Sequence, residues 1–446
     1  MKSILILGAG LSASSLIRYF LENSSKNDWL IRIVDRDLEI VKQKINGHPN
    51  GTALSFNALD AEERRPEIKK SDIVISMLPA RFHVDVAKDC IELKTNLITP
   101  SYISPEMEEL DQAAKYAGIV IMNEIGVDPG LDHMSAMKVI NEIKAKGGEL
   151  IGFESFTGGL IAPDSDNNPW NYKLTWNPRN VVLAGQGGAA KFIQEGKYKY
   201  IPYNRLFRRT EIIEIEGYGK FEGYANRNSL SYRETYGLEG IPTIFRGTLR
   251  RKGFSKAWNV FVQMGATDDS YTLEDSRNMT KREFINSFLH YHPTDSVELK
   301  LRYKMKIDQD DAIWDKLEWL GIFEDEGFDL DSDVTPAQYL QKIIEEKWVL
   351  DPEDKDMLVM WHKFNYTFNG KGYEITSHMI NIGEDQVYTS MSNTVGLPAA
   401  ICGKMILNGT ITAKGVTLPT HKDIYTPILE ELKEYDIFFI EKEIEQ

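Results

Sequence analysis

Residues 1–36 read MKSILILGAGLSASSLIRYFLENSSKNDWLIRIVDR, and this stretch decides the fold. Met1 to Leu7 is a short apolar run that leads directly into Gly8-Ala9-Gly10-Leu11-Ser12-Ala13. An amphipathic stretch follows, and a second apolar run from Leu30 to Val34 ends in Asp35. This order of strand, tight turn, helix, strand and acid is the pattern of a dinucleotide-binding βαβ unit. The sequence therefore predicts a nucleotide-binding domain in its first part.

The small residues of the turn have separate physical roles at a pyrophosphate. Gly8 allows the sharp turn out of the strand, and Gly10 lacks a Cβ, so the backbone can approach the phosphates closely. The helix that begins near Leu11 points its free N–H groups at the same phosphates. A nicotinamide dinucleotide is the expected ligand, with FAD or no nucleotide as the alternatives. Its predicted contacts in this turn are Gly8, Gly10, Leu11, Ser12 and Ala13.

The acid after the second strand predicts which nicotinamide dinucleotide binds. Asp35 lies 25 residues after Gly10, within the usual distance for accepting hydrogen bonds from the ribose diol of the adenosine. A carboxylate at this place repels a 2′-phosphate, so Asp35 favours NAD. Arg36 comes next and suits a 2′-phosphate, which keeps NADP open.

The composition, with 42% hydrophobic and 27% charged residues, indicates a soluble globular protein. The chain has 446 residues, enough for about two to three domains, and a formal net charge of -15. The negative charge disfavours nucleic acid or an anionic membrane as a partner, since phosphate binding needs clustered Lys and Arg. Two cysteines imply no disulfide framework, and no apolar run is long enough to span a membrane. With a first strand that begins at Ser3 and leaves no room for a signal peptide, a cytoplasmic location is expected.

Further apolar runs complete a doubly wound parallel sheet by about residue 125, so we expect an α/β fold. Ligands of such sheets bind at the carboxyl ends of the strands. His83 follows one of these ends, and two roles are open for it: it lines the cofactor cleft, or it makes a local hydrogen bond at a helix start. Two roles are also open for Asn57, which either contacts the adenine or is a polar turn residue. The other candidates at strand ends are Ser76, Met77, Leu78, Thr99, Ser101 and Tyr102.

The exit of the sixth strand is a second focus of the chain. Residues 123–133 read NEIGVDPGLDH and contain Glu124, Asp128, Asp132 and His133. Asp132 and His133 serve as cap and first-turn residues of the next helix, or they face the cleft. Asp128 is nearer the strand end and is the better candidate for touching a substrate. No metal is expected, since these few ligands have the wrong spacing.

The pattern changes from about Glu149. Strand-like runs at Glu211 to Glu216, Thr243 to Arg250 and Asn259 to Met264 predict a mixed or antiparallel sheet in a second domain. Helical patterns at 280–292, 311–320 and 335–347 predict a small helical insertion. Arg227 and Arg246 suit a substrate with several carboxylates, because guanidinium binds carboxylate bidentately, although each alone fits a surface ion pair. The small-residue-rich stretch Ser392 to Leu407 predicts a tightly packed helix.

Several separate motifs, in order along nearly the whole chain, resemble the glutamate-forming saccharopine dehydrogenase (saccharopine reductase) family. They are ISMLP (75–79), PSYISP (100–105), NEIGVDPGLDH (123–133), NNP (167–169) with YK (172–173), YANR (224–227), FRGTLR (245–250) and TVG (394–396).

The resemblance implies a Rossmann domain of residues 1–130 completed by 393–446. It also implies a central saccharopine-binding and dimerisation domain of 131–392, with the helical insertion at about 275–350. The implied reaction interconverts saccharopine with L-glutamate and L-2-aminoadipate 6-semialdehyde by means of NAD(P), in lysine metabolism, and a homodimer is expected. The implied saccharopine contacts are Ser101, Tyr102, Asp128, Arg227, Thr243, Ile244, Phe245 and Arg246. The implied cofactor contacts add Ile125, Gly126, Asp128 and Trp176 to the turn and strand-end residues above.

The chain departs from the family pattern at two places. Members usually have a cysteine where this chain has Thr157, and a threonine cannot titrate as a base near neutral pH. Asp35-Arg36-Asp37 is closer to an NAD-binding turn than to the turn of the fungal NADP enzymes. We therefore expect Asp128 to take the proton of the substrate amine, with Tyr102 as the second candidate and water as the alternative.

Two other functions compete. A carboxynorspermidine synthase-like condensation has the same fold and a diamine substrate, but it would want acids where this chain has Arg227 and Arg246. A non-catalytic NAD-binding protein of the same fold would bind the dinucleotide without the reaction. The sequence leaves the physiological direction open.

Overall fold

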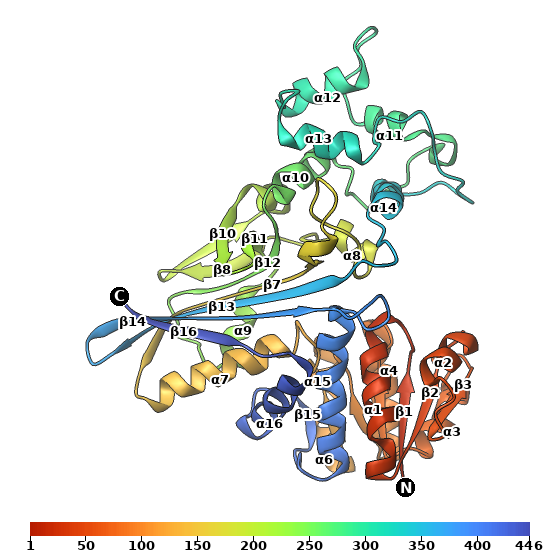
Figure 1. The fold of residues 1–446 in the computed structure, drawn as a ribbon, viewed down its shortest axis with the longest axis vertical. Coiled ribbons are helices and arrows are strands. Elements are labelled where there is room, and N and C mark those ends of the chain that lie inside the picture. The colour runs from red at the N-terminus through yellow and green to blue at the C-terminus, as the bar shows by residue number, and fades with distance from the viewer. The chain divides into compact units, whose positions relative to one another are not determined.

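The computed structural model describes residues 1–446, and the chain divides into two compact units (Figure 1). Unit 1 consists of Met1–Leu150 together with Asp356–Gln446, and unit 2 consists of Ile151–Lys355.

A seven-stranded parallel sheet forms the centre of unit 1, in the order β15-β6-β5-β4-β1-β2-β3. Its strands are β1 (Lys2–Leu7), β2 (Trp29–Val34), β3 (Gly51–Leu54), β4 (Ile73–Ser76), β5 (Asn96–Ile98), β6 (Val120–Met122) and β15 (Gly415–Thr417). The side chains of Ile4 to Leu7 and of Ile73 to Ile75 are fully buried, as continuous apolar runs in a parallel sheet should be. The predicted doubly wound sheet is confirmed, and the C-terminal part of the chain adds β15 at its edge.

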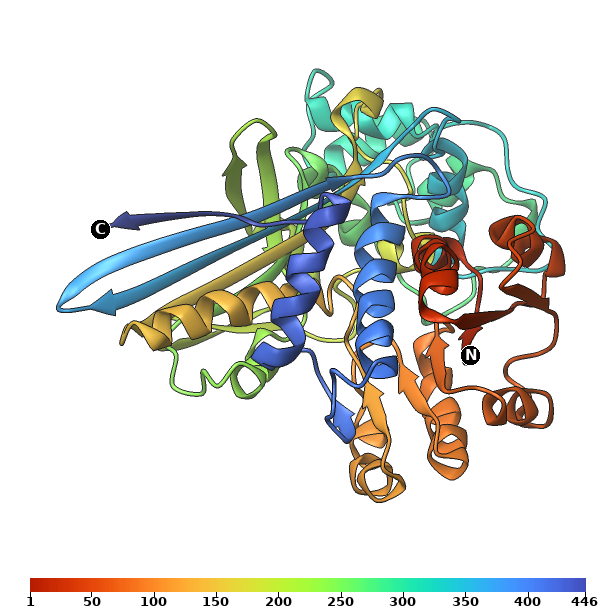
Figure 2. The ribbon, with the colours of Figure 1, turned by 60° about the horizontal axis from the view of Figure 1, so that its bottom comes forward.

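Helices flank this sheet. They are α1 (Ser14–Asn27), α2 (Leu38–Ile45), α3 (Ala61–Lys69), α4 (His83–Leu93), α5 (Pro105–Glu108), α6 (Asp111–Ala117), α7 (Leu131–Ala145), α15 (Ser390–Leu407) and α16 (Lys422–Leu432). Short 3-10 helices occupy Leu11–Ala13, Ala80–Phe82 and Lys433–Tyr435. In two views α15 and α16 lie side by side next to the sheet (Figures 1 and 2).

The small-residue helix α15 packs tightly against α1, as predicted. A Cβ on Gly396 would lie 2.9 Å from the backbone nitrogen of Leu16, so no larger residue fits there without movement. Asn393 Oδ1 accepts a 2.6 Å hydrogen bond from the Ser15 hydroxyl, and Ser392 Oγ accepts one of 2.9 Å from the Ser15 amide. Helix α1 follows the glycine-rich turn, so α15 holds the element that carries this turn.

Unit 1 also contains an antiparallel meander of β13 (Asp356–Phe368), β14 (Lys371–Ile382) and β16 (Ile440–Glu445). The C-terminal strand β16 begins at Ile440, eight residues after the end of α16. Strand β14 pairs with β13 along its whole length and with β16 over Tyr373 to His378.

Unit 2 is built on a mixed sheet. Strand β7 (Glu149–Ile161), of which all but the first two residues lie in this unit, runs parallel to β12 (Ile244–Arg251). The further strands are β8 (Ala190–Gln194), β9 (Lys197–Ile201), β10 (Thr210–Ile215) and β11 (Gly219–Ala225). Strands β8 and β11 are antiparallel to β12, β9 is antiparallel to β8, and β10 is antiparallel to β11. The short 3-10 helices are Pro163–Ser165, Tyr203–Arg208, Ser229–Ser231 and Ser276–Asn278.

One predicted strand of unit 2 is a helix. Asn259 to Met264 belongs to α10 (Phe254–Met264), because Phe254, Trp258 and Phe261 recur at helical spacing and bury one face. These rings pack with Trp170 and Trp348 in an aromatic core. The region predicted to be helical contains α11 (Lys281–Ser287), α12 (Val297–Met305), α13 (Ala312–Trp319) and α14 (Pro336–Lys347). Two short helices, α8 (Pro178–Val182) and α9 (Tyr232–Thr235), lie elsewhere in unit 2.

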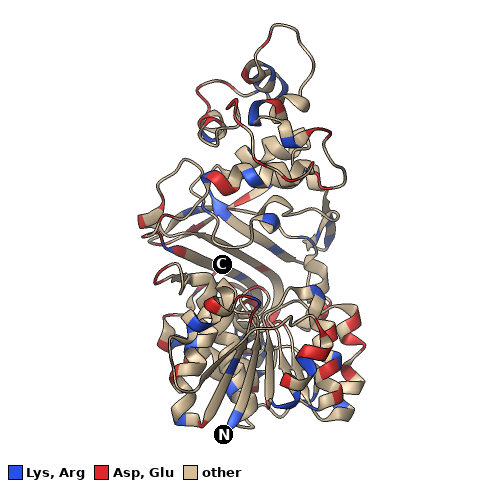
Figure 3. Cartoon of the chain, turned by 90° about the vertical axis from the view of Figure 1, so that its right-hand side faces the viewer, with Lys and Arg blue, Asp and Glu red and all other residues tan.

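The charged residues are spread over the helices and loops. In Figure 3 both acidic and basic residues colour the helices of unit 1, while the strands of its parallel sheet are almost wholly uncharged. None of the helices combines the length and the apolar character needed to cross a bilayer.

The contact at Gly396 generates a stability prediction. Gly396→Val places side-chain atoms against the backbone of α1, and such overpacking costs about 1–3 kcal/mol. We expect a lower midpoint of urea unfolding. Gly372→Val is the matched control, because the nearest atom to its Cβ is 3.7 Å away, and its effect should stay within about 0.5 kcal/mol. Equal midpoints for the two variants would contradict the tight packing of α15 on α1.

Candidate active site

The glycine-rich turn leaves β1 at the carboxyl edge of the parallel sheet. Gly8 has φ +99°, and a Cβ there would lie 3.2 Å from the Met77 carbonyl oxygen, so the turn needs glycine and touches the exit of β4. A Cβ on Gly10 would meet nothing within 4 Å, so the backbone is open to a ligand on that side. The predicted residues Leu11, Ser12 and Ala13 form the 3-10 helix that leads into α1. This open backbone fits the approach of a pyrophosphate.

Asp35 lies directly beside this turn. Its Oδ2 accepts a 2.8 Å hydrogen bond from the Ala9 amide, and its Oδ1 accepts one of 3.2 Å from the Asp37 amide. The carboxylate thus lies next to the turn at the end of β2, where it suits a ribose diol.

Lys44 of α2 also contacts the turn, and the sequence contained no signal for it. Its ammonium donates to the Gly10 carbonyl at 2.7 Å and to the Ser14 hydroxyl at 2.8 Å. Burial lowers the pKa of Lys44 to about 8, and the nearby Asp35 carboxylate works in the opposite direction. A basic group therefore contacts the predicted phosphate turn.

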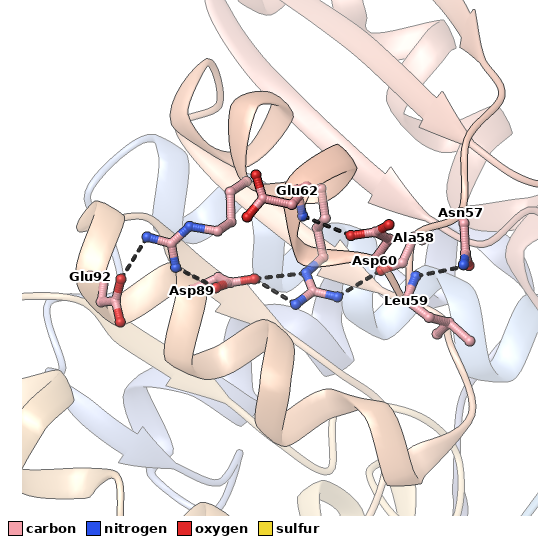
Figure 4. A network of polar contacts seen from close by, with 9 residues as sticks. Asn57, Ala58, Leu59, Asp60, Glu62, Asp89 and Glu92 are labelled. Atoms are coloured by element: carbon pink, nitrogen blue, oxygen red, sulfur yellow. Dashed lines mark hydrogen bonds and ion pairs between the residues drawn. The ribbon is translucent and has the colours of Figure 1, made fainter.

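The turn after β3 places Asn57 beside Arg36. Asn57 Oδ1 accepts a 3.3 Å hydrogen bond from the Arg36 guanidinium and one of 3.2 Å from the Leu59 amide. Figure 4 shows how Asn57, Ala58, Leu59 and Asp60 form this turn beside the Asp89 carboxylate. Arg64 links this turn to Asp89 of α4, since its guanidinium donates to the Ala58 carbonyl and to the Asp89 carboxylate at 2.8 Å each. Asn57 therefore has the local hydrogen bonds of a polar turn residue, and its Oδ1 also accepts from Arg36.

His83 joins two of the strand ends. Its Nδ1 is 3.0 Å from the Ser76 hydroxyl and its Nε2 is 2.9 Å from the Ser101 hydroxyl. Ser76 and Thr99 are fully buried, and Thr99 Oγ1 accepts a hydrogen bond of 3.3 Å from the Ser101 amide. A local bond at the helix start, one of the two alternatives for His83, is not what the structure shows. Its ring bridges a predicted cofactor residue and a predicted substrate residue.

Burial also changes the titration of His83. The side chain is 3 % exposed, and desolvation lowers the pKa of its imidazole to about 4. The ring is therefore neutral near pH 7 and accepts at one nitrogen while it donates at the other.

The two predicted catalytic residues lie together. The Tyr102 hydroxyl donates a 2.8 Å hydrogen bond to Asp128 Oδ1, and Tyr102 is 47 % exposed. The loops that carry them are in close contact, since a Cβ on Gly126 would lie 2.9 Å from Cβ of Pro100. Ile125 is fully buried below them. Tyr102 and Asp128 form a partly exposed, hydrogen-bonded pair at the carboxyl edge of the sheet.

Asp132 does not cap α7. The N-cap of this helix is Gly130, and Asp132 Oδ1 instead accepts a 2.6 Å hydrogen bond from the Gly130 amide within the turn. The buried side chains of Asp132 and His133 therefore brace the loop that carries Asp128. No group of three or more His, Cys, Asp or Glu side chains is arranged to hold a metal ion.

The predicted arginines lie close together in unit 2. The Asn226 amide donates to the Arg246 carbonyl at 2.8 Å, and the Arg246 amide donates to the Ser229 hydroxyl at 2.9 Å. The loop that contains Arg227 is thus held against β12. Arg227 is exposed, whereas the Arg246 guanidinium is buried and stacks 3.7 Å from the centre of the Tyr232 ring.

The remaining predicted residues of unit 2 differ in exposure. Thr243 Oγ1 accepts a 3.0 Å hydrogen bond from the Glu195 amide. The side chains of Ile244 and Phe245 are buried in the core, so they offer a ligand only their main chain. The half-buried Trp176 donates its ring N–H to the Tyr172 hydroxyl at 3.1 Å and belongs to unit 2, unlike the other predicted cofactor residues.

Two further residues of this sheet, Arg250 and Thr157, have buried polar side chains. Arg250 is 2 % exposed, donates to the Leu249 carbonyl at 2.9 Å and lies within 6.0 Å of the ring centres of Tyr172, Tyr224 and Phe254. Thr157 on β7 is the register partner of Thr248 and is 9 % exposed. The position at which relatives were expected to carry a cysteine is thus a buried hydroxyl.

The shifted pKa of His83 generates a prediction for stability. The unfolded chain protonates this ring near pH 6.5 and the folded chain only near pH 4, so folding excludes a proton in that window. The stability of the wild type should fall as the pH drops through this window, by up to about 3 kcal/mol from this group. The free energy of unfolding, measured with urea between pH 7 and 4, should decrease less on acidification in His83→Gln than in the wild type. The exposed-site control His421→Gln should follow the wild type, and identical curves for His83→Gln and wild type would contradict the assignment.

Comparisons with known proteins show which family this chain resembles along its whole length. The family described as "Saccharopine dehydrogenase NADP binding domain" matches residues 4–122, and that described as "Saccharopine dehydrogenase C-terminal domain" matches residues 126–437. Saccharopine dehydrogenase [NADP(+), L-glutamate-forming] of Pyricularia oryzae is 33% identical and covers 97% of both chains. The enzyme of that name from Saccharomyces cerevisiae is also 33% identical and covers 99% of both.

Two further similarities extend this result. The mitochondrial alpha-aminoadipic semialdehyde synthase of Mus musculus is 33% identical over 98% of this chain, which corresponds to 47% of that protein. The solved structure of apo saccharopine dehydrogenase (L-Glu forming) from Saccharomyces cerevisiae has a TM-score of 0.89 and 32% identity, and the match covers 100% of each chain. The resemblance inferred from the motifs is confirmed, and the chain belongs to the saccharopine dehydrogenase family.

Proposed function

We propose that the protein is an NAD(P)-dependent, L-glutamate-forming saccharopine dehydrogenase of lysine metabolism. It interconverts saccharopine and water with L-glutamate and L-2-aminoadipate 6-semialdehyde. The observation that carries the proposal is the Tyr102–Asp128 pair, which lies at the carboxyl edge of a dinucleotide-binding sheet. Family membership over nearly the whole chain supports the same reaction.

The proposed roles of this chain's residues follow from proton and charge requirements. NAD(P)⁺, when bound, supplies the hydride acceptor. The secondary amine of saccharopine must be neutral before hydride leaves its carbon, so a base is needed within hydrogen-bond distance. Asp128 takes this proton, and the Tyr102 hydroxyl holds the carboxylate by its 2.8 Å hydrogen bond. Solvent is the competing base, because Tyr102 is 47 % exposed.

Carboxylate recognition is the second proposed role. Saccharopine has three carboxylates, and we assign Arg227 and Arg246 to bind among them. The Asn226 and Ser229 contacts hold both arginines on one edge of β12. The related condensation of a diamine would require acids at these places, so the arginines favour saccharopine over carboxynorspermidine. A protein that only binds the dinucleotide would have no need of them.

NAD is the proposed preferred cofactor, although the matched family and the fungal relatives carry NADP in their names. The support is Asp35, whose carboxylate lies beside the glycine-rich turn and would repel a 2′-phosphate. Arg36 is engaged by Asn57.

We further propose a cytoplasmic homodimer in which residues 1–130 and 393–446 serve the dinucleotide and 131–392 serve saccharopine and dimerisation. The family resemblance supports this arrangement. Sedimentation of the purified protein tests the dimer.

Substitution of Asp35 tests the cofactor preference. A hydrogen bond to a charged group contributes about 1.5–3 kcal/mol, which corresponds to about 10- to 100-fold in kcat/KM. Asp35→Ala should lower kcat/KM with NAD⁺ by this factor and leave or raise the value with NADP⁺. The measurement is saccharopine-dependent reduction of the two cofactors side by side, with the exposed Glu39→Ala on α2 as control. A parallel change with both cofactors would show that Asp35 does not discriminate between them.

Substitution of the acid/base pair tests the chemistry. Asp128→Asn keeps the size of the side chain and removes the base, so we expect kcat to fall about tenfold or more, with solvent replacing part of the base. The acid limb of the pH profile should change as well. Glu108→Gln, an exposed acid on α5, is the control. An unchanged kcat and pH profile in Asp128→Asn would exclude Asp128 as the base.

A further inference from the structure

Tyr102 and Asp128 come from different segments, and one buried residue contacts both segments. The Glu124 amide donates to the Ser101 carbonyl at 3.1 Å, and Glu124 Oε1 accepts a 2.9 Å hydrogen bond from the Ile103 amide. Glu124 therefore binds the residues on either side of Tyr102. Since the Tyr102 ring is itself half exposed, its place depends on this main-chain attachment.

The same residue begins the loop that carries Asp128. This loop is closed by hydrogen bonds from the Gly126 amide to the Pro129 carbonyl at 2.9 Å and from the Asp132 amide to the Val127 carbonyl at 3.1 Å. A Cβ on Gly130 would lie 2.1 Å from the Gly126 carbonyl oxygen, so the turn is packed backbone on backbone. A shift of Glu124 would therefore move Asp128 and Tyr102 relative to each other.

The side chain of Glu124 is held from below by His133. The His133 ring, fully buried on the first turn of α7, places Nε2 2.6 Å from Glu124 Oε2. Its Nδ1 is 3.5 Å from Asp132 Oδ2. Burial of a carboxylate is costly unless it is paired and hydrogen-bonded, and both oxygens of Glu124 have such partners.

The backbone of Glu124 indicates that its side chain is needed. Its φ is +54°, a left-handed conformation that glycine or asparagine adopts more readily than glutamate. A residue persists in such a conformation when its surroundings determine it, and these conformations cluster at active sites. Glu124 is 5 % exposed and both of its oxygens are engaged, so it does not itself contact a substrate.

We infer that Glu124, held by His133, is the positioning residue that sets the Tyr102–Asp128 pair in place for the reaction. The inference rests on the proposed saccharopine dehydrogenase activity and deepens it. A misplacement of reacting groups by about 1 Å can cost about a hundredfold in rate, so a residue that controls this spacing has a large effect on turnover.

Kinetics of five variants test the inference. Glu124→Ala should lower kcat with saccharopine about tenfold to a hundredfold and leave the KM for the dinucleotide within about twofold. Glu124→Gln retains the acceptor for the Ile103 amide and should recover most of kcat. Glu106→Gln, an exposed acid on α5, is the control and should match the wild type. In a Tyr102→Phe/Asp128→Asn background, Glu124→Ala should add less than about twofold, because the pair that it positions is gone.

The opposite results overturn the inference. An equal loss in both backgrounds, or a raised KM for the dinucleotide with kcat unchanged, would give Glu124 a general structural role. If Glu124→Ala does not fold, Glu124→Gly, which also removes the side chain and accepts the positive φ of this position, is compared in the two backgrounds by the same criterion.

A crystal structure of the Glu124→Gln or Glu124→Ala variant gives a test that needs no activity. The Tyr102 hydroxyl and Asp128 Oδ1 should lie more than about 3.5 Å apart in Glu124→Ala and within hydrogen-bond distance in Glu124→Gln. Retention of the 2.8 Å contact in the Ala variant overturns the inference. If the two variants show the expected distances but the wild type has no activity with saccharopine, the proposed function alone is refuted.

Discussion

Parallel pairing of β1 with both β2 and β4 is the constraint on which the site depends. Leu7 is the register partner of Val34 on one side and of Ser76 on the other. The Gly8 amide then donates to the Val34 carbonyl at 2.8 Å, and the Met77 amide donates to the Leu7 carbonyl at the same distance. Because parallel strands end at one edge, the glycine-rich turn, Asp35 and Ser76 emerge together. Strands β5 and β6, parallel to β4, bring the segments of Tyr102 and Asp128 to the same edge.

Above that edge, buried polar contacts fix groups that the strands alone leave free. His83 ties the end of β4 to Ser101, and Glu124 ties the Tyr102 segment to the Asp128 loop. Each of these side chains is almost fully buried, so each requires its partners and restricts their positions. The partly exposed Tyr102–Asp128 pair is therefore held by buried side chains whose hydrogen bonds are satisfied, and this is the preorganisation that the proposed acid/base role requires.

Agreement between sequence and structure is best where a pattern has a single physical cause. The apolar runs of β1, β2 and β4 are buried as expected, and the small residues of α15 allow the close contact at Gly396. The prediction of a strand at Asn259 to Met264 was wrong because a short apolar run fits a strand and a buried helix equally well. The helical repeat that begins at Phe254 makes this segment part of α10. Lys44 and the bridging role of His83 escaped prediction because their partners are 30 and 18 residues away along the chain.

By itself the sequence determined the dinucleotide turn, the doubly wound parallel sheet and the residue types that suit a tricarboxylate substrate. These are local properties: backbone freedom at Gly8 and Gly10, the periodicity of apolar residues and the charge of Asp35, Arg227 and Arg246. Only the tertiary structure decided that Tyr102 binds Asp128, that Asp132 braces a turn instead of capping α7, and that Glu124 contacts both loops. The physical reason is that hydrogen bonds form between neighbours in space, and residues 102, 124 and 128 become neighbours only when β5 and β6 pair.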